Sequence, residues 1–278
     1  MKLQVDGRTA YAYSGGKTFD AALPCVVFIH GALHDHSGWT LLARWCAHHG
    51  HSVLAVDLPA HGQSDGPALP DVQSIAAWLL ALLDAAGVKR AALVGHSMGS
   101  LIALQAAAVA PERITRLVML GTAYPMKVSE ALLQTALDEP LRAIEMVNAW
   151  SISTHASKPS FPGPGMWVHG SNRALMRRVQ AGVCTVSPAF NLFHHDFSIC
   201  NAYDGGFDAA AKVRCPVTLV LGERDQMTTP KSSHELAAAL KARVVMVPSG
   251  HHLMAEAPDA VLNALRDALS AAIRDPLI

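Results

Sequence analysis

A five-residue run around Ser97 has the composition of a nucleophile site. Gly95-His96-Ser97-Met98-Gly99 follows a short apolar segment and precedes an alanine-rich one. Glycines two residues on either side let a chain turn sharply from a strand into a helix, because a β-carbon there would clash. Such a turn would expose the serine hydroxyl and leave the N–H of Met98 at a helix start, free to donate to an oxyanion. The run therefore predicts a nucleophilic serine at position 97.

A serine hydroxyl is a weak nucleophile near neutral pH, so it needs a base and a group that orients the base. The expected partners are a histidine on a loop near the chain end and a carboxylate after a late strand. Asp225 follows the apolar segment 217–221, and His251 follows the segment 243–247. Ser97, Asp225 and His251 thus occur in the order serine, acid, base. Their types and order predict a catalytic triad.

Two neighbouring residues compete for the roles of acid and base. His252 is adjacent to His251, and side chains one residue apart point in different directions, so only one of them can be the base. Glu223 lies two residues before Asp225 and could replace it as the acid. The residue types alone leave both choices open.

The elements that must position these residues alternate between strand and helix. Strands are expected at 3–5, 9–13, 25–29, 52–56, 91–94, 114–120, 217–221 and 243–247. Helices are expected at 39–48, 72–86, 100–110, 231–240 and 258–274. The first two strands turn at Asp6-Gly7 as an antiparallel hairpin. The alternation predicts an α/β fold with a mostly parallel central sheet flanked by helices.

Between about residues 122 and 213 the alternation stops. Helical pieces are expected at 130–137, 140–150 and 172–181. The irregular segment 157–170 contains three prolines and three glycines. The economical interpretation is one α/β core formed by residues 1–124 and 213–278, with a helical cap at 125–212 inserted after the sixth strand.

The composition excludes several classes of protein. The 278 residues are 51% apolar and 16% charged, which excludes intrinsic disorder. Lys plus Arg equals Asp plus Glu, at 22 each, which argues against a nucleic-acid partner. No apolar run approaches the ~20 residues of a membrane span, so none is expected. Five scattered cysteines do not suggest a disulfide framework, and the N-terminus lacks the apolar stretch of a secretory signal, so the cytoplasm is the expected location.

Further segments resemble the α/β-hydrolase superfamily, in its small capped branch of serine esterases and carbon–carbon hydrolases. They are His30-Gly31, residues 57–64 (DLPAHGQS), residues 222–225 (GERD), and Gly250-His251 followed by Glu256. The resemblance covers nearly the whole chain outside the cap. Ala60 departs from the pattern, since many relatives have glycine there, and this change should alter only a turn.

The resemblance implies a role for each candidate residue. Ser97 would be the nucleophile, His251 the general base and Asp225 the orienting acid. The oxyanion would be bound by the backbone N–H groups of Ala32 and Met98.

The resemblance also decides between the competing neighbours. A preceding glycine and a glutamate five residues later select His251 over His252 as the base. The family spacing favours Asp225 over Glu223 as the acid. Asp57 is similar to a loop aspartate of the family that braces structure, so it is left out of the triad.

Candidate substrate contacts come from one loop and from the cap. They are His34, His36, Met146, Trp150 and Trp167. The loop histidines flank Asp35, and bracing hydrogen bonds or a metal site are the alternatives to substrate contact; no metal is expected, because no third or fourth ligand is evident. His194-His195-Asp196 in the cap is interpreted as solvated or structural.

The expected activity is hydrolysis of a small, hydrophobic carboxylic ester, thioester or lactone without a metal or organic cofactor. A carbon–carbon bond hydrolase with the same triad is the alternative, with Arg177 and Arg178 as candidates to bind an anionic substrate. A cofactor-free oxygenase and a slow-turnover ligand receptor are weaker alternatives. The expected partner is the small-molecule substrate, and the oligomeric state is left open between monomer and homodimer.

Overall fold

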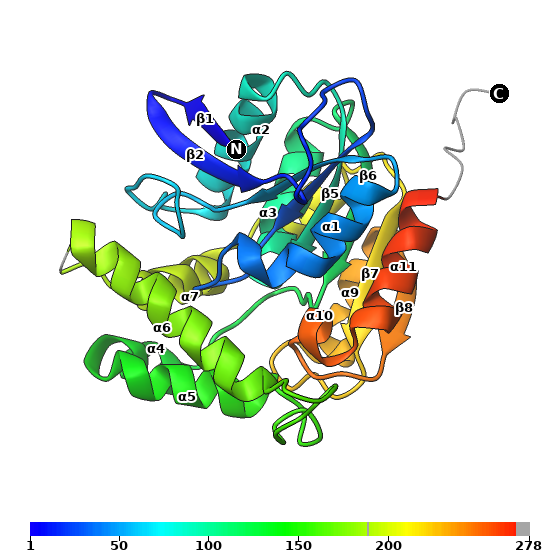
Figure 1. The fold of residues 1–278 in the computed structure, drawn as a ribbon. Coiled ribbons are helices and arrows are strands. Elements are labelled where there is room, and N and C mark those ends of the chain that lie inside the picture. The colour runs from blue at the N-terminus through cyan, green and yellow to red at the C-terminus, as the bar shows by residue number, and fades with distance from the viewer. Residues whose placement is uncertain (188, 271–278) are drawn as a thin grey trace.

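The computed structural model describes residues 1–187 and 189–270. Within them, eight strands form one sheet in the order β1-β2-β4-β3-β5-β6-β7-β8 (Figure 1). The strands are β1 (Lys2–Val5), β2 (Arg8–Tyr13), β3 (Cys25–Ile29), β4 (Ser52–Val56), β5 (Ala91–His96), β6 (Ile114–Leu120), β7 (Val217–Gly222) and β8 (Arg243–Val247). β2 pairs antiparallel with both β1 and β4, and the strands from β3 to β8 pair in parallel with one another. The predicted fold class is confirmed.

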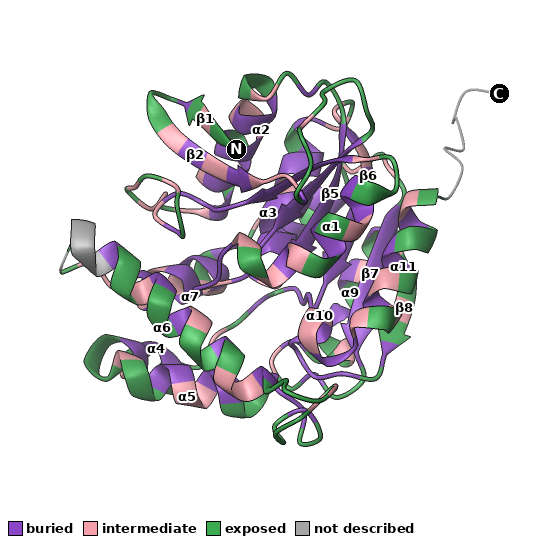
Figure 2. Cartoon of the chain, in the orientation of Figure 1, coloured by how far each residue is buried: buried purple, intermediate pink, exposed green. Residues whose placement is uncertain are grey.

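Both faces of the central strands are buried under helices (Figure 2). Val27 and Ile29 of β3 belong to the apolar cluster that packs under α2 and α3, whereas Val26 and Phe28 belong to the cluster under α1 and α11. This alternation is the two-residue period of a strand. The helices of the core are α1 (Thr40–His48), α2 (Val72–Ala85), α3 (Met98–Val109), α8 (Gly206–Ala210), α9 (His234–Ala239), α10 (Leu253–Glu256) and α11 (Pro258–Ser270), with 3-10 turns η1 (His36–Trp39) and η2 (Pro230–Ser233).

Four helices between β6 and β7 form a separate layer beside the end of the sheet (Figure 1). They are α4 (Glu130–Asp138), α5 (Pro140–Ser151), α6 (Val168–Val186) and α7 (Leu192–Ala202). They surround a third apolar cluster, which also takes in Leu33 from the loop after β3. We call these helices and their connections the cap; its predicted boundaries at 125 and 212 stay a prediction.

Helix α7 was not predicted from the sequence. Its buried side is Leu192, Phe193, Phe197 and Cys200, but it is interrupted by the buried Asp196. A carboxylate in the apolar stripe hides the 3.6-residue period on which a helix prediction depends. The predicted last helix, 258–274, is seen as α11 up to residue 270, and residues 271–274 lie outside the described residues. No helix in the described ranges combines the length and the apolar character needed to cross a membrane.

Candidate active site

The turn at Ser97 connects β5 directly to α3. Ser97 has φ of 52° and ψ of −120°, a conformation that a residue other than glycine rarely adopts. A β-carbon on Gly95 would overlap the carbonyl oxygen of Gly99 and lie 2.7 Å from the nitrogen of Ser100. One on Gly99 would lie 2.6 Å from the carbonyl oxygen of His30. The two glycines therefore allow the backbone contacts that make the turn sharp.

A β-carbon at Gly99 is expected to cost about 3 kcal/mol or more of unfolding free energy, because only rigid backbone surrounds it. We expect this loss for Gly99→Ala in urea unfolding. Gly38→Ala is the matched control, since nothing lies within 4 Å of its added β-carbon and its φ is not positive. Equal stability of the two variants would contradict the close packing of the turn.

His251 and Asp225 form a buried pair on the loops after β8 and β7. Nδ1 of His251 donates to Oδ2 of Asp225 over 2.8 Å. The carboxylate also accepts from the hydroxyl of Thr228 at 2.7 Å and from the N–H groups of Met227 and Thr228, each at 2.8 Å. Burial alone would raise the pKa of Asp225, but His251 and these hydrogen bonds lower it below its ordinary value. Asp225 is thus an ionised carboxylate held in one orientation.

Four histidine rings lie together behind the turn. His96, which precedes the serine, donates from Nε2 to the carbonyl oxygen of His251 over 2.9 Å, with the ring centroids 4.9 Å apart. His252 and His34 complete the group, with centroids 5.4 Å apart. Burial lowers the pKa of His96 to about 3 and that of His34 and His252 below the ordinary value. Within the group, only His251 is bonded to a carboxylate, and its role as the base stays a prediction.

The two predicted oxyanion donors are available. Gly31 lies beside Ser97, because a β-carbon on Gly31 would be 3.3 Å from that of Ser97. The loop then forms a turn in which the N–H of His34 donates to the carbonyl oxygen of Gly31 over 3.3 Å. Across residues 1–187 and 189–270, the N–H groups of Ala32 and Met98 donate to no protein acceptor, and the Ser97 hydroxyl makes no hydrogen bond. The roles of these groups stay predictions.

The cap braces the loop of the predicted base. The N–H of His251 donates to the carbonyl oxygen of Ser151, at the end of α5, over 2.6 Å. Oε2 of Glu256 accepts from the N–H of Gly250 at 3.0 Å and from that of Ser153 at 3.2 Å. The backbone of the cap is therefore part of what positions the His251 loop.

The predicted substrate contacts are only partly brought together. Met146 packs against the same apolar cluster as Ala32. His34 donates from Nδ1 to the carbonyl oxygen of Ala32 at 2.7 Å and lies 2.8 Å from Oδ1 of Asn172 through Nε2. Trp150 and Trp167 are 41% and 49% exposed. Contact of all these residues with substrate stays a prediction.

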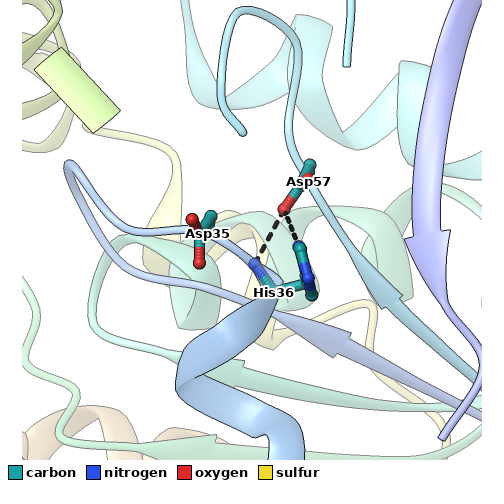
Figure 3. Close-up of side chains that lie close together, drawn as sticks. All are labelled: Asp35, His36 and Asp57. Carbon is teal, nitrogen blue, oxygen red and sulfur yellow. Dashed lines mark hydrogen bonds and ion pairs between the residues drawn. The ribbon is translucent and has the colours of Figure 1, made fainter. Parts of the chain in front are cut away.

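His36 and its neighbours form a braced loop (Figure 3). Oδ1 of Asp57 accepts from the backbone N–H and from Nδ1 of His36, over 2.7 and 2.8 Å. Asp35 accepts from Ser37 and, at 2.7 Å, from Arg178 of the cap. The side chains of Asp35, His36 and Asp57 offer ligand atoms within 4.8 Å of one another, and the two carboxylates also accept the hydrogen bonds just described. Asp57 thus links the loop after β3 to the loop after β4 through its hydrogen bonds to His36.

A cavity of about 1150 Å³ opens between this loop and α6. Its lining includes His36 and Arg178 but not Ser97, Asp225 or His251. The other lining residues are Arg8, Asp35, Ser37, Ala60, 62–68, Val179, Gly182, Val183, Ser187 and Phe190. His36 therefore lines a cavity that does not include Ser97, Asp225 or His251.

Thr228 and Asn172 were missed in the sequence, and Asp196 was interpreted there only as solvated or structural. Thr228 supports Asp225, and its signal was the Asp-x-x-Thr spacing, in which a side chain caps the amides that follow it. Asn172 and Asp196 contact His34 and Leu33 from the cap. No local pattern links residues that are more than 130 positions apart.

The comparisons with known proteins agree with this architecture. The family model described as the alpha/beta hydrolase fold matches residues 24–161. The chain is 24% identical over 269 residues to (E)-2-((N-methylformamido)methylene)succinate hydrolase of Acinetobacter baylyi, and the match covers 94% of each chain. It is 38% identical over 113 residues to the dihydrolipoyllysine-residue acetyltransferase component of the acetoin cleaving system of Cupriavidus necator, covering 40% of this chain and only 28% of that protein.

The structure is also similar to solved hydrolases. The enol-lactonase from Burkholderia xenovorans LB400 superposes with a TM-score of 0.81 at 22% identity, covering 97% of this chain and 99% of the lactonase. At that identity the likeness shows the fold alone. Taken with the family model and the arrangement of strands around the turn at Ser97, these findings show that the chain has the α/β-hydrolase fold.

Proposed function

We propose that the protein is a serine hydrolase that cleaves a small, hydrophobic carboxylic ester, thioester or lactone through an acyl-enzyme on Ser97. The observation that carries the proposal is the meeting of the strained turn at Ser97 with the buried His251–Asp225 pair. His96 joins the two, because it precedes the serine in the chain and donates to the carbonyl oxygen of His251. Strain of this kind is typical of functional sites.

In the proposed mechanism, His251 takes the proton of the Ser97 hydroxyl as the oxygen attacks the substrate carbonyl. Because Nδ1 of His251 donates to Asp225, the neutral ring has its lone pair at Nε2, and the carboxylate stabilises the imidazolium that forms. The oxyanion is bound by the N–H groups of Ala32 and Met98. His251 then protonates the leaving group and activates water for deacylation. None of these steps uses a metal ion or an organic cofactor.

The apolar cluster of the cap supports a hydrophobic substrate. Ala32 lies on the loop after β3, which we call the oxyanion loop, and Met227 lies on the loop after β7 that carries Asp225. Both pack against this cluster, together with Met146 of α5. Substrate sites are mostly apolar with a few polar anchors, and this cluster adjoins both catalytic loops. A carbon–carbon hydrolase is less well supported, because Arg178 is bonded to Asp35 and Arg177 is exposed, so neither arginine is buried at the triad.

Rates on p-nitrophenyl esters from acetate to decanoate test this proposal. We expect multiple turnovers with an optimum chain length, and Met146→Ala should favour longer chains by about fourfold in kcat/KM per additional buried methylene. Leu141→Ala is the matched control, because Leu141 is 56% exposed on the same helix. If wild-type protein hydrolyses none of the esters above background, ester hydrolysis is the wrong reaction. An unshifted optimum in Met146→Ala would remove Met146 from the acyl site.

A further inference from the structure

A buried carboxylate of the cap touches the loop that carries a predicted oxyanion donor. Asp196 lies on α7 and is 1% exposed. Its Oδ2 accepts a 2.7 Å hydrogen bond from the N–H of Leu33 and lies 2.9 Å from Nε2 of His61. Leu33 directly follows Ala32 in the chain. One carboxylate oxygen therefore joins a cap helix, the oxyanion loop and the loop after β4.

The ring of His61 faces an acceptor at each nitrogen. Nδ1 lies 3.0 Å from the carbonyl oxygen of Pro59, and Nε2 faces the carboxylate of Asp196. A carbonyl and an ionised carboxylate only accept, and a neutral imidazole has one N–H. Both contacts are satisfied together only by the imidazolium. Burial alone would lower the pKa of His61, but the charge and hydrogen bond of Asp196, with the Pro59 carbonyl, raise it above its ordinary value.

The other titratable groups around this pair are compatible with a positive His61. The ring of His30 lies 4.8 Å away, and burial together with the charge of His61 holds the pKa of His30 well below its ordinary value. The charge of Asp57 raises the pKa of His61 further. Burial and the charge of Asp196 raise the pKa of the Cys200 thiol on α7, so that group stays neutral. His61 and Asp196 thus form a pair of one positive and one negative group. Their neighbours His30 and Cys200 are neutral, and Asp57 is a further group whose charge favours the positive His61.

The backbone at Leu33 needs support of this kind. Leu33 has φ of 53°, a left-handed conformation that favours glycine, and its side chain is fully buried in the apolar cluster of the cap. A bulky residue keeps such a conformation only where its surroundings impose it. Here the surroundings are the apolar cluster around the side chain and the Asp196 acceptor at the N–H. Together they determine how the peptide between Ala32 and Leu33 is oriented.

We propose that Asp196, paired with the imidazolium of His61, is a positioning residue that fixes the turn at Leu33 and so aims the N–H of Ala32 at the oxyanion. The inference rests on the proposed function, because the oxyanion role of Ala32 belongs to it. It makes the cap part of the catalytic geometry.

The pairing gives the activity an alkaline limit with a definite sign. The pKa of His61 is raised in the folded protein, so the stabilisation by the pair is complete below the ordinary pKa of histidine. It is lost as the pH rises through the raised value. The proton that remains stays on Nε2, facing the carboxylate, so the ring becomes neutral, the lone pair of Nδ1 faces the carbonyl oxygen of Pro59, and the turn at Leu33 loosens.

The test compares Asp196→Asn and His61→Gln with wild type and with His195→Gln. His195 is the matched control, because it lies on the same helix and contacts a core carbonyl, that of Leu69, at 2.9 Å. The readouts are kcat and KM on the best p-nitrophenyl ester, the rate at which a fluorophosphonate labels Ser97, and both rates against pH. The ¹⁵N shifts of the His61 ring are measured on wild-type protein.

We expect Asp196→Asn to lower kcat and the labelling rate together by roughly 10- to 100-fold, less than removal of an oxyanion donor costs, with KM changed less than about threefold. His61→Gln offers Asp196 a donor that does not titrate, so the alkaline decline attributed to His61 should disappear. His195→Gln should stay within about twofold of wild type. The His61 ring should be doubly protonated at pH 7.

Different outcomes overturn different claims. A wild-type protein that neither turns over esters nor reacts with the fluorophosphonate overturns the proposed function and this inference with it. A reactive wild type with an equally reactive Asp196→Asn overturns this inference alone. A singly protonated His61 at pH 7, or an alkaline decline unchanged in His61→Gln, does so too. The ring shifts and the wild-type pH profile need no variant, so the inference is tested even where Asp196→Asn does not fold.

Discussion

Replacing Ser97 with alanine is expected to lower kcat/KM for a p-nitrophenyl ester by ~10³-fold or more. The change removes the oxygen that attacks the substrate in the proposed mechanism and leaves the oxyanion amides and the apolar cluster in place. Stability should hardly change, because the Ser97 hydroxyl makes no hydrogen bond to any described residue. Initial rates and urea unfolding of the same preparations measure both effects.

Ser100→Ala is the control, because we expect it to lower stability while changing the rate far less than Ser97→Ala does. The hydroxyl of Ser100, one turn into α3, donates to the carbonyl oxygen of Ser97 at 2.6 Å and lies 2.7 Å from Oγ1 of Thr122. Its loss should cost about 1–2 kcal/mol of unfolding free energy, with far less effect on rate than Ser97→Ala. Equal rates for wild type and Ser97→Ala would show that the ester is cleaved by another group.

His251→Gln is expected to lower kcat by ~10³-fold or more, whereas His252→Gln should lower it by less than about tenfold. The two residues are adjacent, but only His251 reaches the carboxylate of Asp225, at 2.8 Å. The ring of His252 packs near His34, and burial keeps it neutral through a lowered pKa. Single-turnover and steady-state rates on one ester at pH 7 measure the difference.

Asp225→Asn extends this comparison, because an amide no longer holds the base in the required tautomer. We expect Asp225→Asn to lower kcat by ~10⁴-fold, a loss similar to that of His251→Gln. Glu223→Gln is the control for charge on the same loop, since Glu223 is exposed. A larger loss in His252→Gln than in His251→Gln would reverse the assignment of the base. A larger loss in Glu223→Gln than in Asp225→Asn would do the same for the acid.

The sheet could be predicted closely because its signals are local. The strands at 25–29, 52–56, 114–120 and 243–247 were predicted to the residue. The first three are apolar runs covered on both faces of the sheet and bounded by turn residues, so little tertiary information is needed to find them. The turn at Ser97 is local as well, because its glycines are required by backbone contacts within one strand–helix junction and the strand next to it.

Ala60 departs from the sequence pattern of the resemblance, and the structure shows what conformation it takes. It has φ of 68°, the left-handed conformation that glycine adopts easily, and its N–H still donates to the carbonyl oxygen of Asp65 over 3.1 Å. The chain therefore forms a turn here with alanine in a left-handed conformation.

The polar contacts between cap and core could not be predicted in the same way. His61 meets Asp196 across 135 positions of sequence, and His34 meets Asn172 across 138. Each pair depends on how the cap packs against the sheet, which no short window of residues encodes. The same polar residue that joins the layers, Asp196, also concealed the helix that carries it.

The 2.6 Å hydrogen bond between Ser151 and the N–H of His251 bears on how the protein could be engineered. A foreign cap would have to supply a backbone carbonyl at the end of its second helix, or the loop of His251, the proposed general base, would lose a partner. A cap that moved away as a rigid lid would break the same bond.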